Sequence, residues 1–134
     1  MSKPVPQPTT DTREFWAGCN REQLLYQKCR HCRHVQFYPR QNCIACDSPD
    51  VVFEPSTGLG NVYSYTVVHH PANDSFKADT PFVLALVDFD EGFRAMLNVV
   101  GDGSQEIRIS ARVCVVFEQR TPDQKIPQAR LQLA

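Results

Sequence analysis

The sequence predicts a mainly β protein in which a short N-terminal helix and a small metal-bound ribbon precede a closed barrel of five strands. Two observations lead to this prediction. Four of the six cysteines form two close pairs, Cys29 with Cys32 and Cys43 with Cys46. After Val51 the chain is a series of short apolar, β-branched segments separated by Gly, Pro and Asp, which is typical of short strands joined by tight turns.

The composition suits one modest core and no membrane segment. Of the 134 residues, 42% are hydrophobic and 22% are charged, as in ordinary globular domains. The longest apolar stretches are far shorter than the roughly 20 residues that a membrane helix needs. The N-terminus lacks the charged start and apolar run of a secretory signal, which favours a cytoplasmic location. In a reducing cytoplasm, six cysteines are more often metal ligands or buried thiols than disulfides.

The N-terminal part of the chain is expected to be a disordered tail followed by a helix. Residues 1–12 are rich in Pro, Thr and Gln and have few large apolar side chains, so burial cannot offset their ordering entropy. Residues 13–22 suit a short helix that displays Phe15 and Trp16. A helix of this length buries little by itself, so its aromatic side chains either pack on the barrel or contact a partner. We favour the partner and keep packing on the barrel as the alternative.

Residues 23–54 are expected to form the metal-bound ribbon, with short strands over 24–28 and 35–38 around the first cysteine pair. Two residues separate the cysteines within each pair, and ten residues separate the pairs. A tight turn with this spacing aims two thiolates at one point, and two such turns complete a tetrahedron around one ion. Four protein sulfurs close the coordination shell, so the ion is structural and stabilises a ribbon that has almost no core.

Zinc is the metal that this site favours, although iron could fill the same cage of four sulfurs. Four thiolates leave about two negative charges around a divalent ion, which nearby basic side chains can partly neutralise. Turns of this kind often have glycine directly after the second cysteine, where the backbone enters the left-handed region. This sequence has Arg33 and Asp47 at those two places.

Residues 55–134 are expected to form the closed barrel. Alternation of apolar and polar residues is clearest over 93–99 and 113–117. Closure of the sheet removes the exposed strand edges that an open sheet of this size would leave. The expected strands are 62–69, 82–89, 94–100, 112–118 and a weaker one at 129–133.

The residues do not predict catalysis. His69 and His70 precede Pro71 at the end of an expected strand, and they have no nucleophile, carboxylate or phosphate-binding loop beside them in the sequence. A role in a turn or at the barrel rim is therefore favoured over a catalytic one. The two remaining cysteines, Cys19 and Cys114, are expected to be buried thiols rather than reactive ones.

A long series of motifs resembles one known family, the zinc-ribbon plus OB-fold proteins that accompany thiolase-like and other acyl-CoA enzymes. The likeness covers nearly the whole chain after the tail, which makes it far more specific than the cysteine pairs alone. In chain order the motifs are EFW at 14–16, LLYQKC at 24–29, QFYPR at 36–40, the second cysteine pair, GNVYSYTVVH at 60–69, TPFV at 80–83, DEG at 90–92 and VCVVFE at 113–118.

The resemblance implies a helical N-terminal segment, a rubredoxin-like zinc ribbon and a five-stranded OB-type barrel. It also implies a non-catalytic role beside an enzyme, with thiolases, hydroxymethylglutaryl-CoA synthase, enoyl-CoA hydratases and the lipid-transfer-protein aldolases of steroid side-chain breakdown as partners. Acyl-CoA is the implied ligand. The residues expected to bind it are Arg30, Arg33, Arg40 and His69, and those expected at the partner interface are Phe15 and Trp16.

A module that binds single-stranded nucleic acid is the main alternative, because OB barrels and zinc ribbons also occur in such proteins. Residues 41–118, however, contain eleven acidic and four basic side chains, whereas a strand-binding groove needs basic side chains between aromatic ones. Rubredoxin-like electron transfer is a third possibility, which would require iron and a red protein. We therefore expect an accessory subunit of an acyl-CoA enzyme complex.

Overall fold

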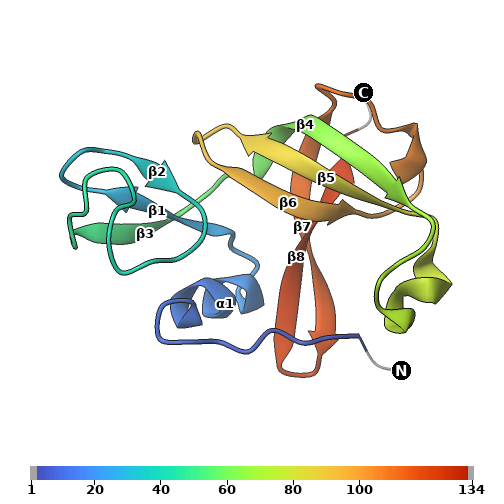
Figure 1. Cartoon of the computed structure of the whole chain (residues 1–134), viewed down its shortest axis with the longest axis horizontal. Helices are drawn as coiled ribbons and strands as arrows, with labels where there is room; N and C mark the ends of the chain where they lie inside the picture. Colours follow the sequence, from blue (N-terminus) through green and yellow to red (C-terminus); the bar gives the residue numbers. More distant parts are fainter. Residues whose placement is uncertain (1–2, 133–134) are drawn as a thin grey trace.

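The computed structural model describes residues 3–132 and contains a small three-stranded sheet, a closed barrel and a helix beside both (Figure 1). The helix α1 (Arg13–Asn20) is shorter than the predicted 13–22. The small sheet has the order β2-β1-β3, and both of its strand pairs are antiparallel. Its strands are β1 (Leu25–Cys29), β2 (Val35–Gln36) and β3 (Val51–Pro55).

The barrel closes in the order β4-β5-β6-β8-β7, with β6 and β8 parallel and the other pairs antiparallel. This order is that of a five-stranded Greek-key barrel, so the predicted mainly β fold is confirmed. The strands are β4 (Leu59–Val68), β5 (Phe82–Phe89), β6 (Arg94–Val99), β7 (Arg112–Thr121) and β8 (Gln124–Leu131). Two short 3₁₀ helices lie in the connections, η1 (Asp74–Asp79) and η2 (Ser104–Glu106).

The last strand differs most from the expectation. β8 begins at Gln124, five residues before the predicted strand, and forms a long hairpin with β7; the expected residue Leu133 lies outside the described residues. The early part of β8 has few apolar side chains and contains Pro127, so its composition does not resemble a strand. Tertiary contacts hold it instead. The side chain of Asn20 accepts from the N–H of Lys125, and its amide donates to the carbonyl of Asp123.

The N-terminal tail, expected to be disordered, is described from residue 3 onward. Residues 3–12 form no helix or strand, but they lie against the barrel near η1 and the β7–β8 hairpin (Figure 1). Lys3 pairs with Asp79, and Arg120 donates to the carbonyl of Pro4. Prolines lower the entropy that ordering costs, so a few contacts suffice to place the segment. Met1 and Ser2 lie outside the described residues.

The core of the barrel follows the alternation seen in the sequence. Every second residue of β5 and β6 is buried, from Val83 to Phe89 and from Ala95 to Val99. In β7, Val113 is fully buried while Val115 and Phe117 are partly buried against the core. No helix within residues 3–132 has the length and apolar character needed to cross a membrane.

An aromatic cluster joins the three parts of the molecule. The ring of Phe93, in the turn before β6, stacks on Phe89 of the barrel at 4.6 Å and on two ribbon residues, Tyr26 at 5.1 Å and Phe37 at 5.3 Å. Phe15 of α1 meets Phe37 edge-on at 5.4 Å. Such pairs add stability beyond the area that they bury. Helix, ribbon and barrel therefore share one core.

Replacing Phe93 with alanine should remove the centre of this cluster and lower the free energy of unfolding by about 3–5 kcal/mol. Denaturant unfolding followed by circular dichroism measures the loss. Met96→Ala, nearby on β6, is the control; because that side chain is 58% exposed, its loss should stay within about 0.5 kcal/mol. A loss below about 1 kcal/mol for Phe93→Ala would show that the three parts do not depend on the cluster.

Candidate metal centre and adjoining groove

The two cysteine turns have the same backbone geometry. In the first, the N–H of Arg33 donates to the carbonyl of Cys29; in the second, the N–H of Asp47 donates to the carbonyl of Cys43. Arg33 and Asp47 have φ values of 68° and 65°, in the left-handed region. The two residues thus occupy the conformation in which turns of this kind usually have glycine, as their places in the sequence indicated.

The four sulfurs converge on one point. Their Sγ atoms all lie within 4.8 Å of one another. The separation is 3.6 Å between Cys29 and Cys46 and 3.5 Å between Cys32 and Cys43. A tetrahedral zinc site with Zn–S bonds of 2.3 Å has sulfur-to-sulfur edges of about 3.8 Å. The donor set therefore fits one zinc ion, and four sulfurs leave no open coordination position.

Backbone hydrogen bonds and the crowding of the sulfurs act on the thiols in opposite directions. The N–H of Cys32 donates to Cys29 Sγ at 3.4 Å and lowers the pKa of this thiol to about 6. The backbone N–H of Ser48 favours the thiolate of Cys46, but burial and the neighbouring sulfurs outweigh it and raise the pKa to about 12. One of the four cysteines can thus be a thiolate without a metal ion. Ionising all four requires the positive charge of a metal ion.

Two buried glutamines hold the loop that brings the second cysteine pair to the site, and the sequence analysis missed both. Gln27 Oε1 accepts from the N–H of Arg40, and Gln27 Nε2 donates to the carbonyl of the same residue. Gln36 donates to Gln27 and accepts from the N–H of Ile44. The sequence did contain a signal for this role, namely a polar residue at an inward-facing position of each short strand. A buried amide needs several hydrogen-bond partners, so such a residue is expected to bind nearby backbone.

The two remaining cysteines lie outside the cage. Cys19 is fully buried, and burial raises its pKa to about 12, so it is an inert thiol as predicted. Cys114 on β7 is half-buried. Neither belongs to the group of residues that could hold a metal ion.

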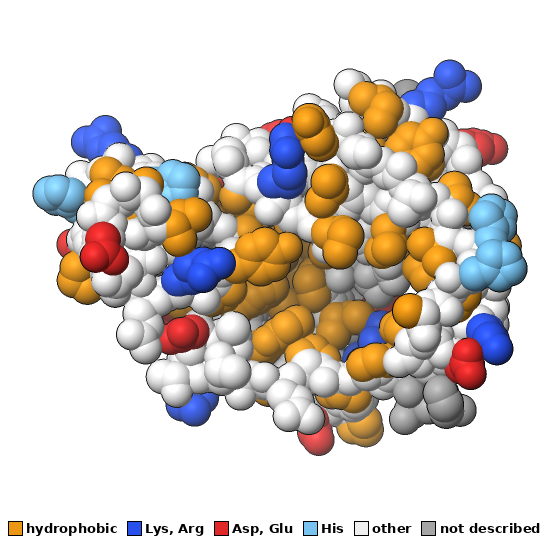
Figure 2. All heavy atoms as spheres, viewed as in Figure 1, with side chains coloured by type: hydrophobic (Ala, Val, Ile, Leu, Met, Phe, Trp, Pro, Cys, Tyr) orange, Lys and Arg blue, Asp and Glu red, His pale blue; other side chains and the backbone are white. Residues whose placement is uncertain are grey.

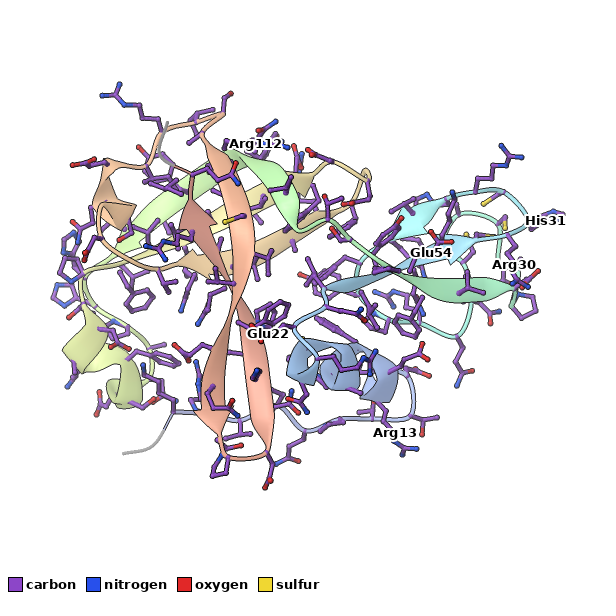
Figure 3. The ribbon with its side chains drawn as sticks, turned by 180° about the vertical axis from the view of Figure 1, so that it is seen from behind. Arg13, Glu22, Arg30, His31, Glu54 and Arg112 are labelled. Atoms are coloured by element: carbon purple, nitrogen blue, oxygen red, sulfur yellow. The ribbon has the colours of Figure 1, made fainter. Side chains whose placement is uncertain are left out.

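The four residues expected to bind acyl-CoA do not come together. Arg30 lies with His31 at the tip of the ribbon, far from the barrel (Figure 3), and faces Asp50 at 3.8 Å. Arg33 and Arg40 are exposed on the same ribbon. His69 is exposed just past the end of β4, the strand that runs from the ribbon toward the opposite side of the barrel (Figure 1).

Phe15 and Trp16, the expected interface residues, have different surroundings. Phe15 is only 5% exposed and belongs to the shared core, so it offers little surface to a partner, and its place at an interface stays a prediction. The helix docks through this ring, which stacks on Trp16 at 4.9 Å. Trp16 is half-buried and remains accessible from one side.

Trp16 lines an apolar groove of about 510 Å³ where the helix, the ribbon and the barrel meet. Figure 2 shows the hydrophobic side chains that gather in this hollow, between the ribbon and the barrel. Residues from five parts of the chain form its wall, including Val5, Trp16, Tyr38, Met96 and Pro127. Tyr38, Met96 and Val5 are large apolar side chains that remain exposed. Exposed apolar surface of this kind marks a binding site.

Two family models match the chain. They are the rubredoxin-like zinc ribbon domain of ChsH2, over residues 16–52, and the C-terminal OB-fold domain of ChsH2, over residues 54–118. A chain of the solved structure titled "Ltp2-ChsH2(DUF35) aldolase" is similar with a TM-score of 0.85 and 30% identity, covering 96% of this chain and 100% of that chain. These matches confirm the predicted combination of a zinc ribbon with an OB-fold barrel.

Two curated relatives have similar sequences. A probable enoyl-CoA hydratase alpha subunit of Thermomonospora curvata is 31% identical over 125 residues, which are 93% of this chain but only 39% of that protein. A DUF35 domain-containing scaffold protein of Methanocaldococcus jannaschii is 31% identical over 101 residues, which are 75% of this chain and 71% of that protein. The likeness to the second protein thus extends over most of both chains.

Replacing Cys29 with serine should lower the metal content well below one ion per chain, because serine is a poor ligand for zinc and three cysteines leave the shell open. The ribbon should then lose its fold, since binding energy and folding energy are coupled in such sites. Elemental analysis of the purified variant and its thermal unfolding measure both effects. Cys114→Ser, outside the cage, is the control and should retain the metal. Full metal content in Cys29→Ser would contradict the site.

Replacing Arg33 with glycine should raise the free energy of unfolding by about 0.5–1 kcal/mol, because glycine adopts the left-handed conformation without steric cost. Arg33→Ala is the matched control. It removes the same side chain but keeps a Cβ, so it should bring no gain. Chemical unfolding of the metal-loaded proteins compares them. Equal stability of the two variants would show that the turn is not strained at this residue.

Proposed function

The chain belongs to the DUF35 family and has the zinc ribbon and OB-fold domains of ChsH2, and we propose that it is a non-catalytic subunit of an enzyme that acts on acyl-CoA thioesters. The observation that carries the proposal is the similarity to a ChsH2 chain in the Ltp2-ChsH2(DUF35) aldolase, which extends over all of that chain. The partner we propose is a thiolase-like enzyme of the lipid-transfer-protein aldolase type, with an enoyl-CoA hydratase as the second choice.

The chemistry of the metal centre supports a structural role. Four cysteines fill the tetrahedral shell, so the ion has no position for an activated water or a substrate carbonyl. Two exposed histidines of the barrel, His69 and His70, lie at the far end of β4 and not at the metal. The reaction would accordingly take place on residues of the partner enzyme.

The accessible side of Trp16 and the groove around it are the proposed contact with the partner. Interfaces are enriched in Trp, Tyr and Met, and a few buried aromatic residues usually carry most of the binding energy. Trp16, Tyr38 and Met96 bring these three residue types to one hollow. Arg40 directly follows Pro39 of the groove wall, and it could contact the phosphates of an acyl-CoA held by the partner.

The charge arrangement of the barrel argues against the nucleic-acid alternative. Arg94 pairs with Asp88 and Arg112 pairs with Asp90, in both cases through two hydrogen bonds. These carboxylates hold the guanidinium groups that a polyanion would otherwise bind. The acidic surplus of residues 41–118 adds repulsion, so a protein partner fits the surface better than a nucleic-acid strand.

Purification of the tagged chain from its native host tests the proposal. An enzyme that acts on acyl-CoA thioesters should co-purify in a fixed ratio and be identified by mass. Recovery of the chain alone, or with nucleic acid in place of an enzyme, would overturn the assignment.

Trp16→Ala should weaken binding to that enzyme by about 2 kcal/mol or more, with a much smaller effect on the melting temperature. Ile109→Ala is the control, because Ile109 is an exposed apolar side chain outside the groove. Isothermal titration calorimetry and thermal unfolding separate the two effects. A collapsed melting temperature with unchanged affinity would make Trp16 a core residue and reject the interface.

A further inference from the structure

The N-terminal segment is seated on the apolar groove in an extended form. Pro4, Val5 and Pro6 line the groove together with residues of the helix, the ribbon and the barrel. In Figure 1 the segment crosses the β7–β8 hairpin on its way from η1 to the start of α1. A proline-containing peptide of the same chain therefore forms one wall of the groove.

Arg120 on β7 binds the backbone of this segment. Its side chain is only 10% exposed, and its Nε and Nη2 both donate to Glu118 Oε2. The remaining group, Nη1, donates to the carbonyl of Pro4 at 2.8 Å, which is its acceptor within residues 3–132. A guanidinium that is nearly buried needs acceptors for its donors. Arg120 is thus a fixed receptor for one peptide carbonyl.

Arg120 also lies between two cavities. The groove of about 510 Å³ is on one side, and a smaller cavity of about 240 Å³ near η1 and η2 is on the other. Pro4 lines the first and Lys3 lines the second, so the segment passes from one to the other at the arginine. The two cavities thus adjoin at Arg120, along the course of Lys3 and Pro4.

The segment is held loosely. Pro4 and Val5 are exposed, and the pair between Lys3 and Asp79 is open to solvent on both sides. Exposed ion pairs contribute little to stability. Prolines favour the extended polyproline conformation, which binds to aromatic surfaces at a low entropic cost. A peptide of similar composition could therefore replace the segment.

We propose that the surface beside this groove, which residues 3–6 cover in the free chain through the contact of Pro4 with Arg120, is a binding site for an extended, proline-containing peptide, and that in the complex a segment of the partner enzyme takes their place. The identity of the enzyme rests on the proposed function, but the peptide site does not. An acyl chain is a poorer occupant, because it offers no acceptor to Arg120 Nη1 and would leave that donor unpaired. Glu118 and Asp79 beside the path disfavour anionic ligands.

The test uses the full chain with its segment loosened by four substitutions, Lys3→Ser, Pro4→Gly, Val5→Gly and Pro6→Gly. A synthetic peptide of residues 1–8 is titrated into this variant, and the fluorescence of Trp16, the only tryptophan of the chain, reports its arrival in the groove. The loosened variant should bind at least tenfold more tightly than the unmodified chain, whose own segment competes. The matched control, Gln7→Gly with Pro8→Gly, alters two residues outside the groove and should behave as the unmodified chain.

A second peptide, in which a methylene group replaces the carbonyl of Pro4, tests the role of Arg120 without altering the protein. It should bind at least tenfold more weakly than the natural peptide. No saturable fluorescence change with the loosened variant, or equal affinity for the two peptides, would overturn the proposed site.

The same loosened variant should bind the co-purifying enzyme several-fold more tightly than the unmodified chain. Unchanged or weaker binding would show that the enzyme does not replace the segment. If an enzyme co-purifies but the peptide does not bind, the peptide site is wrong and the proposed function stands. If the peptide binds but no enzyme co-purifies, the proposed function is wrong instead.

Discussion

The stacking of Phe93 against the ribbon is the interaction on which the rest of this structure depends. A ribbon of three short strands and a helix of eight residues cannot bury a core of their own. Phe37 and Tyr26 place their rings on Phe93, and Phe15 brings the helix to the same point. The groove lies where these three parts meet. Phe15 and Phe37, which belong to the cluster, are also part of its wall. The same aromatic residues therefore contribute both to the core and to the wall of the groove.

The metal centre makes the ribbon rigid enough for this packing. Between β2 and β3 the chain has no regular structure, and the second cysteine pair lies in that loop. Its position is fixed twice. The sulfur cage holds it, and so do hydrogen bonds between the side chains of Gln27 and Gln36 and the backbone of Arg40 and Ile44. The same loop continues from Phe37 and Tyr38, which contact the core and the groove. By ordering this loop, a bound ion would also help to place the groove residues Phe37 and Tyr38.

The sequence could predict what depends on local chemistry. Cysteine spacing defined the cage, period-two alternation defined β5 and β6, and missing glycines pointed to the two left-handed residues. It could not predict what depends on contacts between distant segments. Phe15 and Trp16 are adjacent aromatic residues, yet one is core and the other is half-exposed, because α1 docks with one side against Phe37. The early half of β8 depends on its contact with Asn20. The position of residues 3–6 depends in the same way on Arg120.

The arrangement of charge and apolar surface explains why such a protein would act through a partner. On the barrel, Arg94 is paired with Asp88, its cross-strand partner, and Arg112 is paired with Asp90, so these guanidinium groups are neutralised. The apolar side chains gather instead in the hollow beside the ribbon. A partner could cover most of these side chains without disturbing the core, since only Phe15 and Leu97 of the groove wall are buried. Such a surface has one apolar region and paired charges elsewhere. It favours binding to a specific protein, because neither a membrane nor a polyanion would bind it strongly.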